Sequence, residues 1–489
     1  MPRGGRRVTT RRELVNALAA IVGREHVLYR TEDLVVYELD GTIDRSLPHA
    51  VVFPNEAGEV REIVAVCNSL RLPVTPRGAG TGLSGGAVPT RRGVVVATAR
   101  MRRILSVDAI ERVAVVEPGV PNIQLSEVAA EHGLFYAPDP SSQKACTIGG
   151  NVAENAGGPH CLALGVTTNH VLGLEVVTAD GSLEWLGGRV PDAAGYDLRG
   201  LFVGSEGTLG IATKIVVRLL PLPETIVTLL AIYDDIEAAS ETVSAVIGAG
   251  MVPAALEMID KVTLQAAEAG LQCGYPPDAG AVLLIELDGI AEVVGAQVER
   301  AEAACRDHGA TEIRKATEPA ERELLWKGRK GAIGALGRIA PNYYLLDGVV
   351  PRSRLVETMR KVAEIGERYE FPVANVFHAG DGNLHPSLLF DEREPGATAR
   401  VLEAGAEIMR ACVDAGGALT GEHGVGFEKQ RFMPWLYGEA DLENMGRVRG
   451  VFGNTGDFNP CKILPEGAGC GEMAQQTGAL AAAGPDAYV

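Results

Sequence analysis

Three histidines and a carboxylate fall in two short glycine-containing segments in the last third of the sequence. The first segment, HAGDGNLHP, carries His378 and His385 on either side of Gly380-Asp381-Gly382, which is a strong turn signal. A bend of that size can aim both imidazoles at one point. The second segment, TGEHGVG, adds Glu422 and His423. Two histidines and a carboxylate form a divalent-metal site with open coordination positions, suited to zinc, manganese or iron.

The same spacing allows a second interpretation. Asp381 and Asn383 could simply make the turn, with the histidines as surface polar groups. Three of the nine histidines in the chain fall in these two loops, yet the spacing alone leaves both interpretations open.

Three cations gather in the segment WKGRKGA, which contains Lys327, Arg329 and Lys330. A substrate that carries a carboxylate needs a cation in its site. An arginine forms bidentate pairs with carboxylates that a lysine cannot form. The alternative is a solvated face of a helix, where charged side chains are common.

Glycines dominate a third kind of segment. GTGLSGG, Gly80–Gly86, matches G-x-G-x-x-G, a pattern that binds dinucleotides when a strand precedes it and a helix follows it. LPVTPRG supplies the strand, but GVVVATA, Gly93–Ala99, predicts another strand where the helix should stand. No acidic residue stands at the position that holds a ribose. The sequence therefore excludes a Rossmann site at this loop.

Two further glycine loops follow in the same strand-rich region, Pro138–Gly158 and Gly204–Ile211. Successive glycine amides can form an anion nest without any helix, and hydroxyl groups can add donors. Hydroxyl groups of this kind belong to Thr81, Ser84, Ser141 and Thr147. A lone loop would be only a tight turn, whereas three of them favour one extended nucleotide cofactor. No loop continues into G-K-[ST], which excludes a P-loop NTPase.

The elements that must position these loops change character near residue 222. Before it, runs such as HAVVFP, VAVVEPG and ATKIVVRLLP predict strands, and Asp180-Gly181 predicts a hairpin turn. After it, strands alternate with helices, which predicts an α+β domain with helices covering one face of a sheet. At the start, Thr10 and Glu13 form a capping-box pattern, which favours a helix over an export signal.

Composition excludes several classes of protein. The 489-residue chain has 45 basic and 63 acidic residues, a net charge of −18, so it is a poor candidate for binding nucleic acid. Its eight cysteines contain no C-x-x-C pair, which argues against an iron–sulfur cluster or a zinc ribbon and fits reduced thiols. No apolar run approaches the roughly 18 residues of a membrane span.

The three loops RGAGTGLSGG, DPSS…TIGGNVAENAGG and GSEGTLGI together resemble the FAD domain of the vanillyl-alcohol oxidase / p-cresol methylhydroxylase flavoprotein family. The resemblance is strongest to the branch that contains the bacterial glycolate oxidases, near the D-lactate and D-2-hydroxyglutarate dehydrogenases. It implies an α+β protein with a two-part FAD-binding domain of the p-cresol methylhydroxylase type and an α+β substrate (cap) domain with an antiparallel sheet. The domains expected are an N-terminal helical segment (1–47), an FAD-binding domain (48–222), a cap domain (223–425), a C-terminal return to the FAD domain (426–465) and a disordered tail (466–489).

The resemblance also implies roles for the loops. The first cradles the pyrophosphate of FAD, the second lines the flavin, and the third lies along the nucleotide. The residues expected to bind FAD are Arg77, Gly78, Gly80, Thr81, Gly82, Ser84, Gly85, Asp139, Pro140, Ser141, Thr147, Gly149, Gly150, Asn151, Asn155, Gly157, Gly204, Gly207 and Ile211. No partner for a covalent flavin bond is predicted, because His132, His160 and His170 match no attachment motif.

In the related 2-hydroxy-acid dehydrogenases, the residues that match His378, His385 and Glu422 hold a divalent metal. The residue that matches His423 is the proposed base, and Arg329 aligns with the arginine that binds the substrate carboxylate. The resemblance thus implies hydride transfer from a 2-hydroxy acid to FAD. A lysine that serves D-2-hydroxyglutarate dehydrogenase has no match in NYYLLDG, which favours a short substrate. Glycolate, oxidised to glyoxylate, is the leading candidate, and D-lactate is the alternative.

The expected partners also come from the resemblance. It implies a second FAD-domain subunit and an iron–sulfur subunit that take the electrons, with contact to the inner membrane only through those partners. The expected location is the cytoplasm. A rival from another class is a nonenzymatic nucleotide-binding regulatory subunit, and the intact His/His/Glu/His set speaks against it. Near the end, FNPCKILP resembles an N-P-G-K segment of the family, with Cys461 where glycine is usual.

Overall fold

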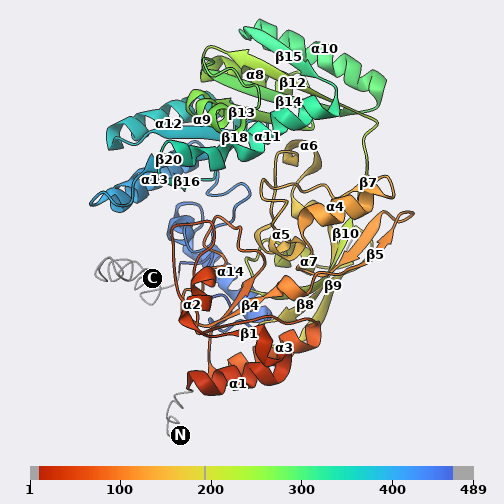
Figure 1. Cartoon of the computed structure of the whole chain (residues 1–489), viewed down its shortest axis with the longest axis vertical. Coiled ribbons are helices and arrows are strands. Elements are labelled where there is room, and N and C mark those ends of the chain that lie inside the picture. Colours follow the sequence, from red (N-terminus) through yellow and green to blue (C-terminus); the bar gives the residue numbers. More distant parts are fainter. Residues whose placement is uncertain (1–9, 192–193, 466–489) are drawn as a thin grey trace.

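The computed structural model describes residues 10–191 and 194–465 (Figure 1). The predicted tail, residues 466–489, lies outside these ranges. Two halves are stacked along the long axis. The upper half, which we call the cap, runs from β12 (Thr225–Tyr233) to α13 (Ala397–Asp414). The lower half, which we call the glycine-loop half, contains the three glycine loops and the C-terminal segment. The mixture of helices and sheets confirms the predicted α+β class.

A four-stranded sheet forms the base of the glycine-loop half, in the order β1-β2-β4-β3, with β2, β4 and β3 parallel. The capping box at Thr10 and Glu13 is confirmed, and it begins α1 (Arg11–Val22). The apolar face of α1 packs with α3 (Ala57–Leu70) against this sheet. The strands are β1 (Val27–Leu28), β2 (Ala50–Val52), β3 (Val74–Arg77) and β4 (Val94–Ala97). The absence of a helix between Gly86 and β4 is confirmed as well.

A five-stranded antiparallel sheet stands beside it, in the order β5-β6-β10-β8-β9. The predicted hairpin is confirmed, because Val177 of β8 pairs with Leu183 of β9 and Gly181 in the turn has a φ of 89°. That value favours glycine. The strands are β5 (Ile104–Asp108), β6 (Val113–Val116), β8 (Val171–Thr178), β9 (Leu183–Gly187) and β10 (Gly210–Arg218).

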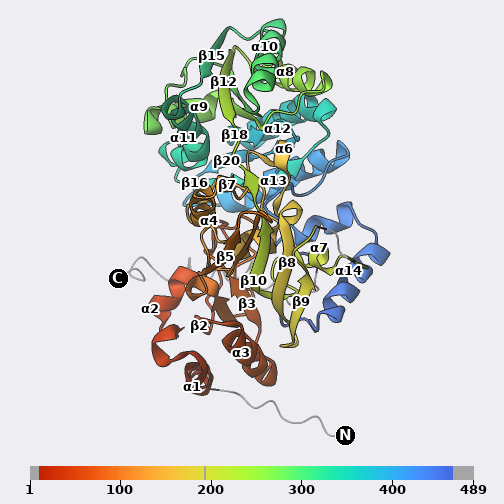
Figure 2. The same cartoon turned by 90° about the vertical axis from the view of Figure 1, so that its right-hand side faces the viewer.

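Short elements connect these sheets and carry the glycine loops. They are η1 (Arg24–His26), α2 (Thr31–Leu34), η2 (Val35–Tyr37), η3 (Thr98–Arg100), α4 (Asn122–Ala130), β7 (Leu134–Phe135), α5 (Ile148–Glu154), α6 (Cys161–Leu164), η4 (Thr167–Asn169), α7 (Leu198–Phe202) and β11 (Leu220–Pro221). In Figures 1 and 2, α6 lies at the upper end of this half, next to the cap.

The cap is built on an antiparallel sheet whose main path runs β15-β12-β14-β13-β18-β19-β17. Our expectation of helices on one face is wrong, because helices cover both faces. Leu229 and Leu283 pack with α8 and α10, whereas Leu230 and Leu284 pack with α9 and α11. Successive residues of β12 and β14 are apolar and point to opposite faces, so each face needs a cover.

The remaining elements of the cap have these bounds: α8 (Ile236–Gly248), β13 (Ala255–Asp260), α9 (Lys261–Leu271), β14 (Ala281–Gly289), α10 (Ala291–Asp307), β15 (Glu312–Ala316), α11 (Pro319–Ala335), η5 (Leu336–Arg338), β16 (Asn342–Leu345), β17 (Gly348–Val349), η6 (Arg352–Arg354), α12 (Leu355–Tyr369), β18 (Val373–His378), β19 (Asn383–Leu384) and β20 (Pro386–Phe390). The chain is split between β16 and β17 at residues 346–347. The split falls where the chain changes partner from β20 to β19, and Asp347 lies at that change.

After the cap the chain returns to the glycine-loop half through η7 (Gln430–Trp435) and α14 (Glu439–Val451). Figures 1 and 2 show this blue segment against the lower half. Phe452 packs into the core of the five-stranded sheet, and Phe458 packs into that of the four-stranded sheet. Val74 of β3 donates to the carbonyl of Asp457 at 2.9 Å and accepts from the amide of Asn459 at 2.7 Å.

The end of this return segment also holds the first glycine loop. The side-chain amide of Asn459 donates to the carbonyls of Gly86 (3.0 Å) and Glu206 (2.6 Å). Cys461 has a φ of 60°, a value that glycine adopts freely. The turn that glycine usually makes in the N-P-G-K segment is therefore present here with a cysteine in it.

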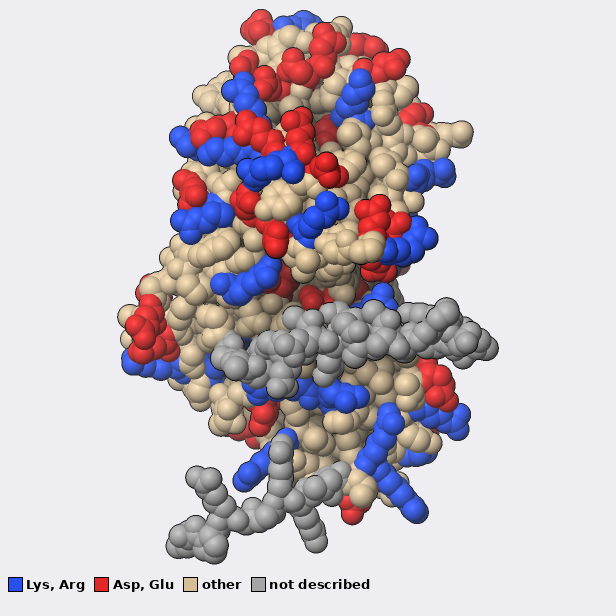
Figure 3. Space-filling model, turned by 90° about the vertical axis from the view of Figure 1, so that its left-hand side faces the viewer, with Lys and Arg blue, Asp and Glu red and all other residues tan. Residues whose placement is uncertain are grey.

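Among the described residues, no helix combines the length and apolar character needed to cross a bilayer. Figure 3 views the molecule from the left-hand side of Figure 1 and shows basic and acidic side chains interspersed over the cap. On that face of the cap, the acidic excess of the chain does not form one patch.

Candidate active site

One cavity runs from the glycine loops to the histidine cluster, so the structure brings most of the predicted site residues together. Arg77 and thirteen other predicted cofactor-binding residues line this cavity, and so do all five predicted catalytic and metal-binding residues. The lining residues among the predictions are Arg77, Gly78, Gly80, Thr81, Gly82, Pro140, Ser141, Thr147, Gly149, Gly150, Asn151, Gly157, Gly207, Ile211, Arg329, His378, His385, Glu422 and His423. Parts of the chain up to 346 residues apart, from Arg77 to His423, thus share one space.

Five predicted cofactor-binding residues lie behind the wall of the cavity: Ser84, Gly85, Asp139, Asn155 and Gly204. They support the wall by contacts within the protein. The Ser84 hydroxyl donates to Glu154 at 3.3 Å, and Asn155 accepts from the amide of Thr168 at 2.9 Å. Asp139 pairs with His160 of the same half and with Lys330 of the cap.

The lining fits an FAD molecule. A Cβ on Gly82 would meet no protein atom closer than 4.0 Å, so this glycine faces open space, whereas a Cβ on Gly80 would overlap the Arg77 guanidinium. The side-chain nitrogen of Asn151 and the hydroxyl of Ser205 are buried without a hydrogen-bond partner, although both residues line the cavity. Buried polar groups need partners, and a nucleotide cofactor would supply them.

Two carboxylates that sequence reasoning missed form part of the wall. Glu154 lies beneath the first glycine loop, and Glu206 accepts hydrogen bonds from the amides of Val425 and Gly426, both at 2.7 Å. Burial raises the pKa of Glu206 to about 7. Glu206 thus ties the third glycine loop to the segment that carries His423.

The histidine cluster sits where three strands and a loop meet. His378 ends β18, His385 stands between β19 and β20, and Gly382 in the bend has a φ of 79°, as the turn signal predicted. Glu422 bridges the two rings, because its Oε1 lies 2.8 Å from Nε2 of His378 and 3.0 Å from Nε2 of His385. All three side chains are largely buried. The interpretation of these histidines as surface groups is therefore wrong.

The donor set of His378, His385 and Glu422 fits a divalent metal. Its ligand atoms lie within 4.8 Å of one another. Three ligands at about 2.1 Å from one ion, placed at right angles, would have their atoms about 3 Å apart, which matches both histidine–carboxylate distances. The chemistry of two imidazoles and one carboxylate also suits zinc, manganese or iron.

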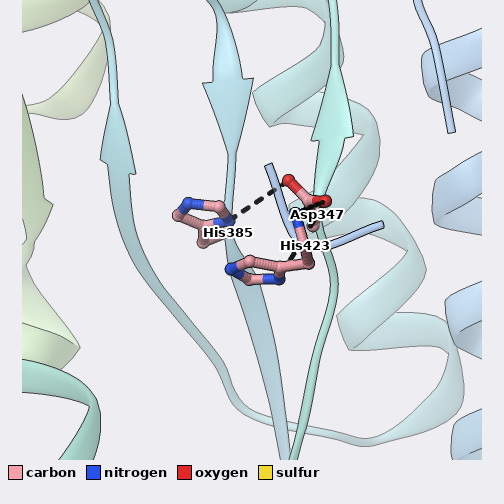
Figure 4. Close-up of side chains that lie close together, drawn as sticks. All are labelled: Asp347, His385 and His423. Atoms are coloured by element: carbon pink, nitrogen blue, oxygen red, sulfur yellow. Dashed lines mark hydrogen bonds and ion pairs between the residues drawn. The ribbon is translucent and has the colours of Figure 1, made fainter. Parts of the chain in front are cut away.

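Asp347 anchors the loop that carries Glu422 and His423 (Figure 4). Its carboxylate accepts from the Thr420 hydroxyl at 2.5 Å, the His423 amide at 3.0 Å and the Lys429 ammonium at 3.2 Å. Asp347, His385 and His423 form a second group whose atoms could reach one ion. Because the Asp347 carboxylate already accepts several hydrogen bonds, we assign it to orienting the loop and not to binding a metal.

His423 lies beside the cluster with its ring free to take a proton. The ring stacks on that of His385, with centroids 4.7 Å apart (Figure 4). Its Nδ1 is buried without a hydrogen-bond partner, and its Nε2 lies 3.9 Å from Glu422. Burial lowers the pKa of His423 to about 4, so the imidazole is neutral near pH 7. A neutral imidazole can accept a proton.

Arg329 extends from α11 into the same cavity and is only 2 % exposed. Its guanidinium pairs with Glu257, at 2.7 Å from Nε and 2.5 Å from Nη2. The other oxygen of Glu257 lies 2.7 Å from Nδ1 of His378, which sits opposite Glu257 on the neighbouring strand. One buried carboxylate therefore orients both the cation and a histidine of the cluster. The interpretation of Arg329 as part of a solvated helix face is wrong.

Sequence reasoning missed Glu257 and Asp347, although each left a signal. Each is a carboxylate next to or within an apolar strand sequence, in AALEMID and YYLLDGVV. A charge in such a run needs a buried partner. Tyr343 and Tyr344 do not face the main cavity; they line a separate one with Asp44 and Glu428.

Comparisons with known proteins identify the family of the chain. Residues 48–187 match the family "FAD binding domain", and residues 222–463 match "FAD linked oxidases, C-terminal domain". The chain is 46% identical over 456 residues to glycolate oxidase subunit GlcD of Escherichia coli K12, covering 92% of this chain and 91% of that one. It is 34% identical over 435 residues to D-lactate dehydrogenase of Archaeoglobus fulgidus, covering 88% and 95%. The structure of p-cresol methylhydroxylase with substrate bound superposes with a TM-score of 0.79 at 19% identity, covering 92% and 96%.

The chain belongs to the FAD-linked oxidase family, with the fold of the p-cresol methylhydroxylase type. The family resemblance inferred from the three glycine loops is confirmed. Within the family, the protein is an FAD-dependent hydroxy-acid oxidoreductase.

Proposed function

We propose that the protein oxidises a short 2-hydroxy acid, with glycolate, converted to glyoxylate, as the first candidate. The observation that carries this proposal is that Arg329, His378, His385, Glu422 and His423 line the same cavity as the glycine loops. D-lactate is the second candidate, because D-lactate dehydrogenases are also among the relatives. Both acids carry a carboxylate next to a hydroxyl group.

In this proposal the residues of the cavity have separate roles. Arg329, fixed by Glu257, binds the substrate carboxylate. The neutral imidazole of His423 removes the hydroxyl proton, and Asp347 holds the backbone of His423 in place. Bound FAD supplies the acceptor for the hydride that leaves the substrate Cα. The reacting cluster is largely buried, which limits the access of water to the reacting carbon.

We further propose that His378, His385 and Glu422 hold a divalent metal in the working enzyme. A metal in that position would lower the pKa of the substrate hydroxyl. Glu257 supports the set by orienting His378 from the far side of the ring. Such supporting carboxylates are common behind metal-binding histidines.

Metal removal tests this assignment. Treatment with a chelator is expected to lower substrate-driven flavin bleaching by about 10²-fold, since a metal supplies several kcal/mol at a developing charge. Zinc, manganese or ferrous ion should restore it. His385→Ala should bleach slowly with or without added metal and should keep its FAD. The exposed His132 provides the control, because His132→Ala should respond to chelation like the unaltered protein. Full activity in metal-free protein would refute the metal site.

A second prediction concerns the cation. Arg329→Lys is expected to raise the KM for the acid about 10- to 100-fold, because hydrogen bonds to charged groups are worth about 1.5–3 kcal/mol and the planar fork is lost. Steady-state kinetics with a dye acceptor measures it. Lys327→Ala on the same helix is the control, since its ammonium reaches only the Leu271 carbonyl at the surface. An unchanged KM in Arg329→Lys would remove Arg329 from the substrate site.

We propose that the electrons leave through a separate protein. The relatives named as GlcD are subunits of glycolate oxidase, which supports a role as the flavoprotein subunit of a larger enzyme. The family resemblance adds a second FAD-domain subunit and an iron–sulfur subunit as partners. In this proposal the chain is cytoplasmic and reaches the inner membrane only through those partners.

An anaerobic screen of 2-hydroxy acids tests the function directly. Glycolate should bleach the flavin absorbance at lower concentration than D-lactate, and reduced protein should pass electrons to a dye faster than to oxygen. Absence of bleaching with every acid tried would favour the nonenzymatic regulatory role.

A further inference from the structure

A buried network of charges joins the two halves beside the cavity but outside the reacting cluster. Its centre is His160, which precedes α6 in the glycine-loop half. Nδ1 of His160 lies 3.0 Å from Asp139, in the loop that borders the cavity. Nε2 lies 3.0 Å from Glu286 on β14 of the cap. The imidazole therefore bridges the two halves.

The geometry defines the charge of this ring. A neutral imidazole has one N–H, so it can donate to only one carboxylate, whereas an imidazolium donates from both nitrogens. Both nitrogens of His160 are within hydrogen-bond distance of a carboxylate that is mostly buried. The Asp139 and Glu286 carboxylates, which are also near Asp288 and Lys330, raise the pKa of His160 to about 10, although burial alone would lower it.

Both carboxylates extend the network to α11, the helix that carries Arg329. Asp139 also accepts from the Lys330 ammonium at 3.2 Å, and that ammonium donates to Gln143 at 2.7 Å. Glu286 accepts from the Trp326 indole at 2.5 Å. Trp326 and Lys330 stand on either side of Arg329 in the sequence, so α11 is held to Glu286 of β14 on one side of that arginine and to the loop at residues 139–143 on the other.

We propose that His160 is a positioning residue: as an imidazolium clamp between Asp139 and Glu286, it fixes α11, and with it Arg329, against the wall of the FAD cavity. The clamp sets the affinity for the substrate carboxylate and leaves the proton and hydride transfers to the reacting cluster. This proposal rests on the proposed function in one respect, the binding of a carboxylate by Arg329. Since both ring nitrogens are engaged, His160 has no role as a flavin attachment point.

Kinetics of two variants test the clamp from its two sides. His160→Gln and Glu286→Gln are expected to raise KM for the 2-hydroxy acid about 10- to 100-fold, as small displacements of a binding group do, with kcat changed less than about threefold. Both should keep FAD, because neither residue lines the cavity. His308→Gln is the control, since His308 lies 3.8 Å from the exposed Glu241. An unchanged KM in either variant that has folded and bound FAD, or a loss confined to kcat, would overturn the proposal.

Two further measurements need no substrate, so they separate failure of the clamp from failure of the proposed function. Hydrogen exchange should be faster in α11 of both variants than in the unaltered protein. In protein labelled with ¹⁵N-histidine, the His160 signal can be assigned because it is absent from His160→Gln. The His160 ring should stay doubly protonated at pH 8, where an ordinary histidine with a pKa near 6.5 is neutral. A His160 signal that titrates between pH 6 and 7, or unaltered exchange in α11, would overturn the clamp even if the enzyme oxidises glycolate.

The stability of the protein should depend on pH through the charge of His160. The folded-state pKa of His160 is raised above its unfolded value, so its contribution to stability is fully present below about pH 6.5 and is lost as the pH rises through about 10. The difference in stability between the unaltered protein and His160→Gln should therefore shrink over that interval. A difference that stays constant from pH 6 to pH 10 would contradict an imidazolium at this position.

Discussion

Replacement of His423 by alanine is expected to slow substrate-driven flavin reduction by about 10²- to 10⁴-fold, the usual contribution of a general base. FAD should remain bound, because the glycine loops that line the cavity are unaltered in this variant. The ring makes no hydrogen bond from Nδ1, so its removal leaves no buried partner unsatisfied. Anaerobic stopped-flow measurement of flavin absorbance gives the rate.

For His423→Ala, the affinity for substrate should be measured together with the rate of flavin reduction. The concentration of acid that gives half the maximal rate should change little, since Arg329 and the proposed metal ligands remain. The surface variant His308→Ala controls for histidine removal in general. Normal bleaching by His423→Ala would show that another group takes the hydroxyl proton.

Gly82→Val is expected to abolish FAD binding while the fold survives. Gly82 lacks the positive φ of Gly80 and Gly85, and a Cβ there has no protein neighbour within 4 Å except Glu154 at 4.0 Å. The added branches would therefore clash with the cofactor and not with the protein. The flavin absorbance per protein after purification measures the loss, and circular dichroism measures the fold.

Gly295→Val is the matched control for this change. Gly295 lies exposed on α10, and a Cβ there meets nothing within 4 Å. This control should keep full flavin. If Gly82→Val also keeps full flavin, the first glycine loop does not contact the cofactor.

Local patterns in the sequence predicted those parts of the fold that depend on neighbouring residues. The Thr10–Glu13 cap, the hairpin at Gly181 and the bend at Gly382 follow from signals a few residues long, and each is present. The histidine bend could be recognised for the same reason, since its geometry is fixed by adjacent glycines. Such signals survive in any tertiary context that tolerates them.

Groups that act across the chain could not be predicted in this way. Glu257 meets Arg329 72 residues away and His378 121 residues away, and Asp347 meets Thr420 73 residues away. The sequence shows that each carboxylate lies in an apolar run, but its partner depends on how strands pair. The helices on both faces of the cap sheet were missed because the apolar run of β12 fits a strand covered on either one face or both.

The return segment has a consequence for how the protein is made. Asn459 supports the first glycine loop from 373 residues further along the chain, through its bond to Gly86. A ribosome delivers residues in order, and N-terminal units fold first as they emerge. The pocket walls at residues 77–86 therefore stay without this support until almost the whole chain has been synthesised. We therefore expect flavin to be acquired only when the chain is nearly complete, so that a supply of free FAD matters to the finished polypeptide and not to the growing one.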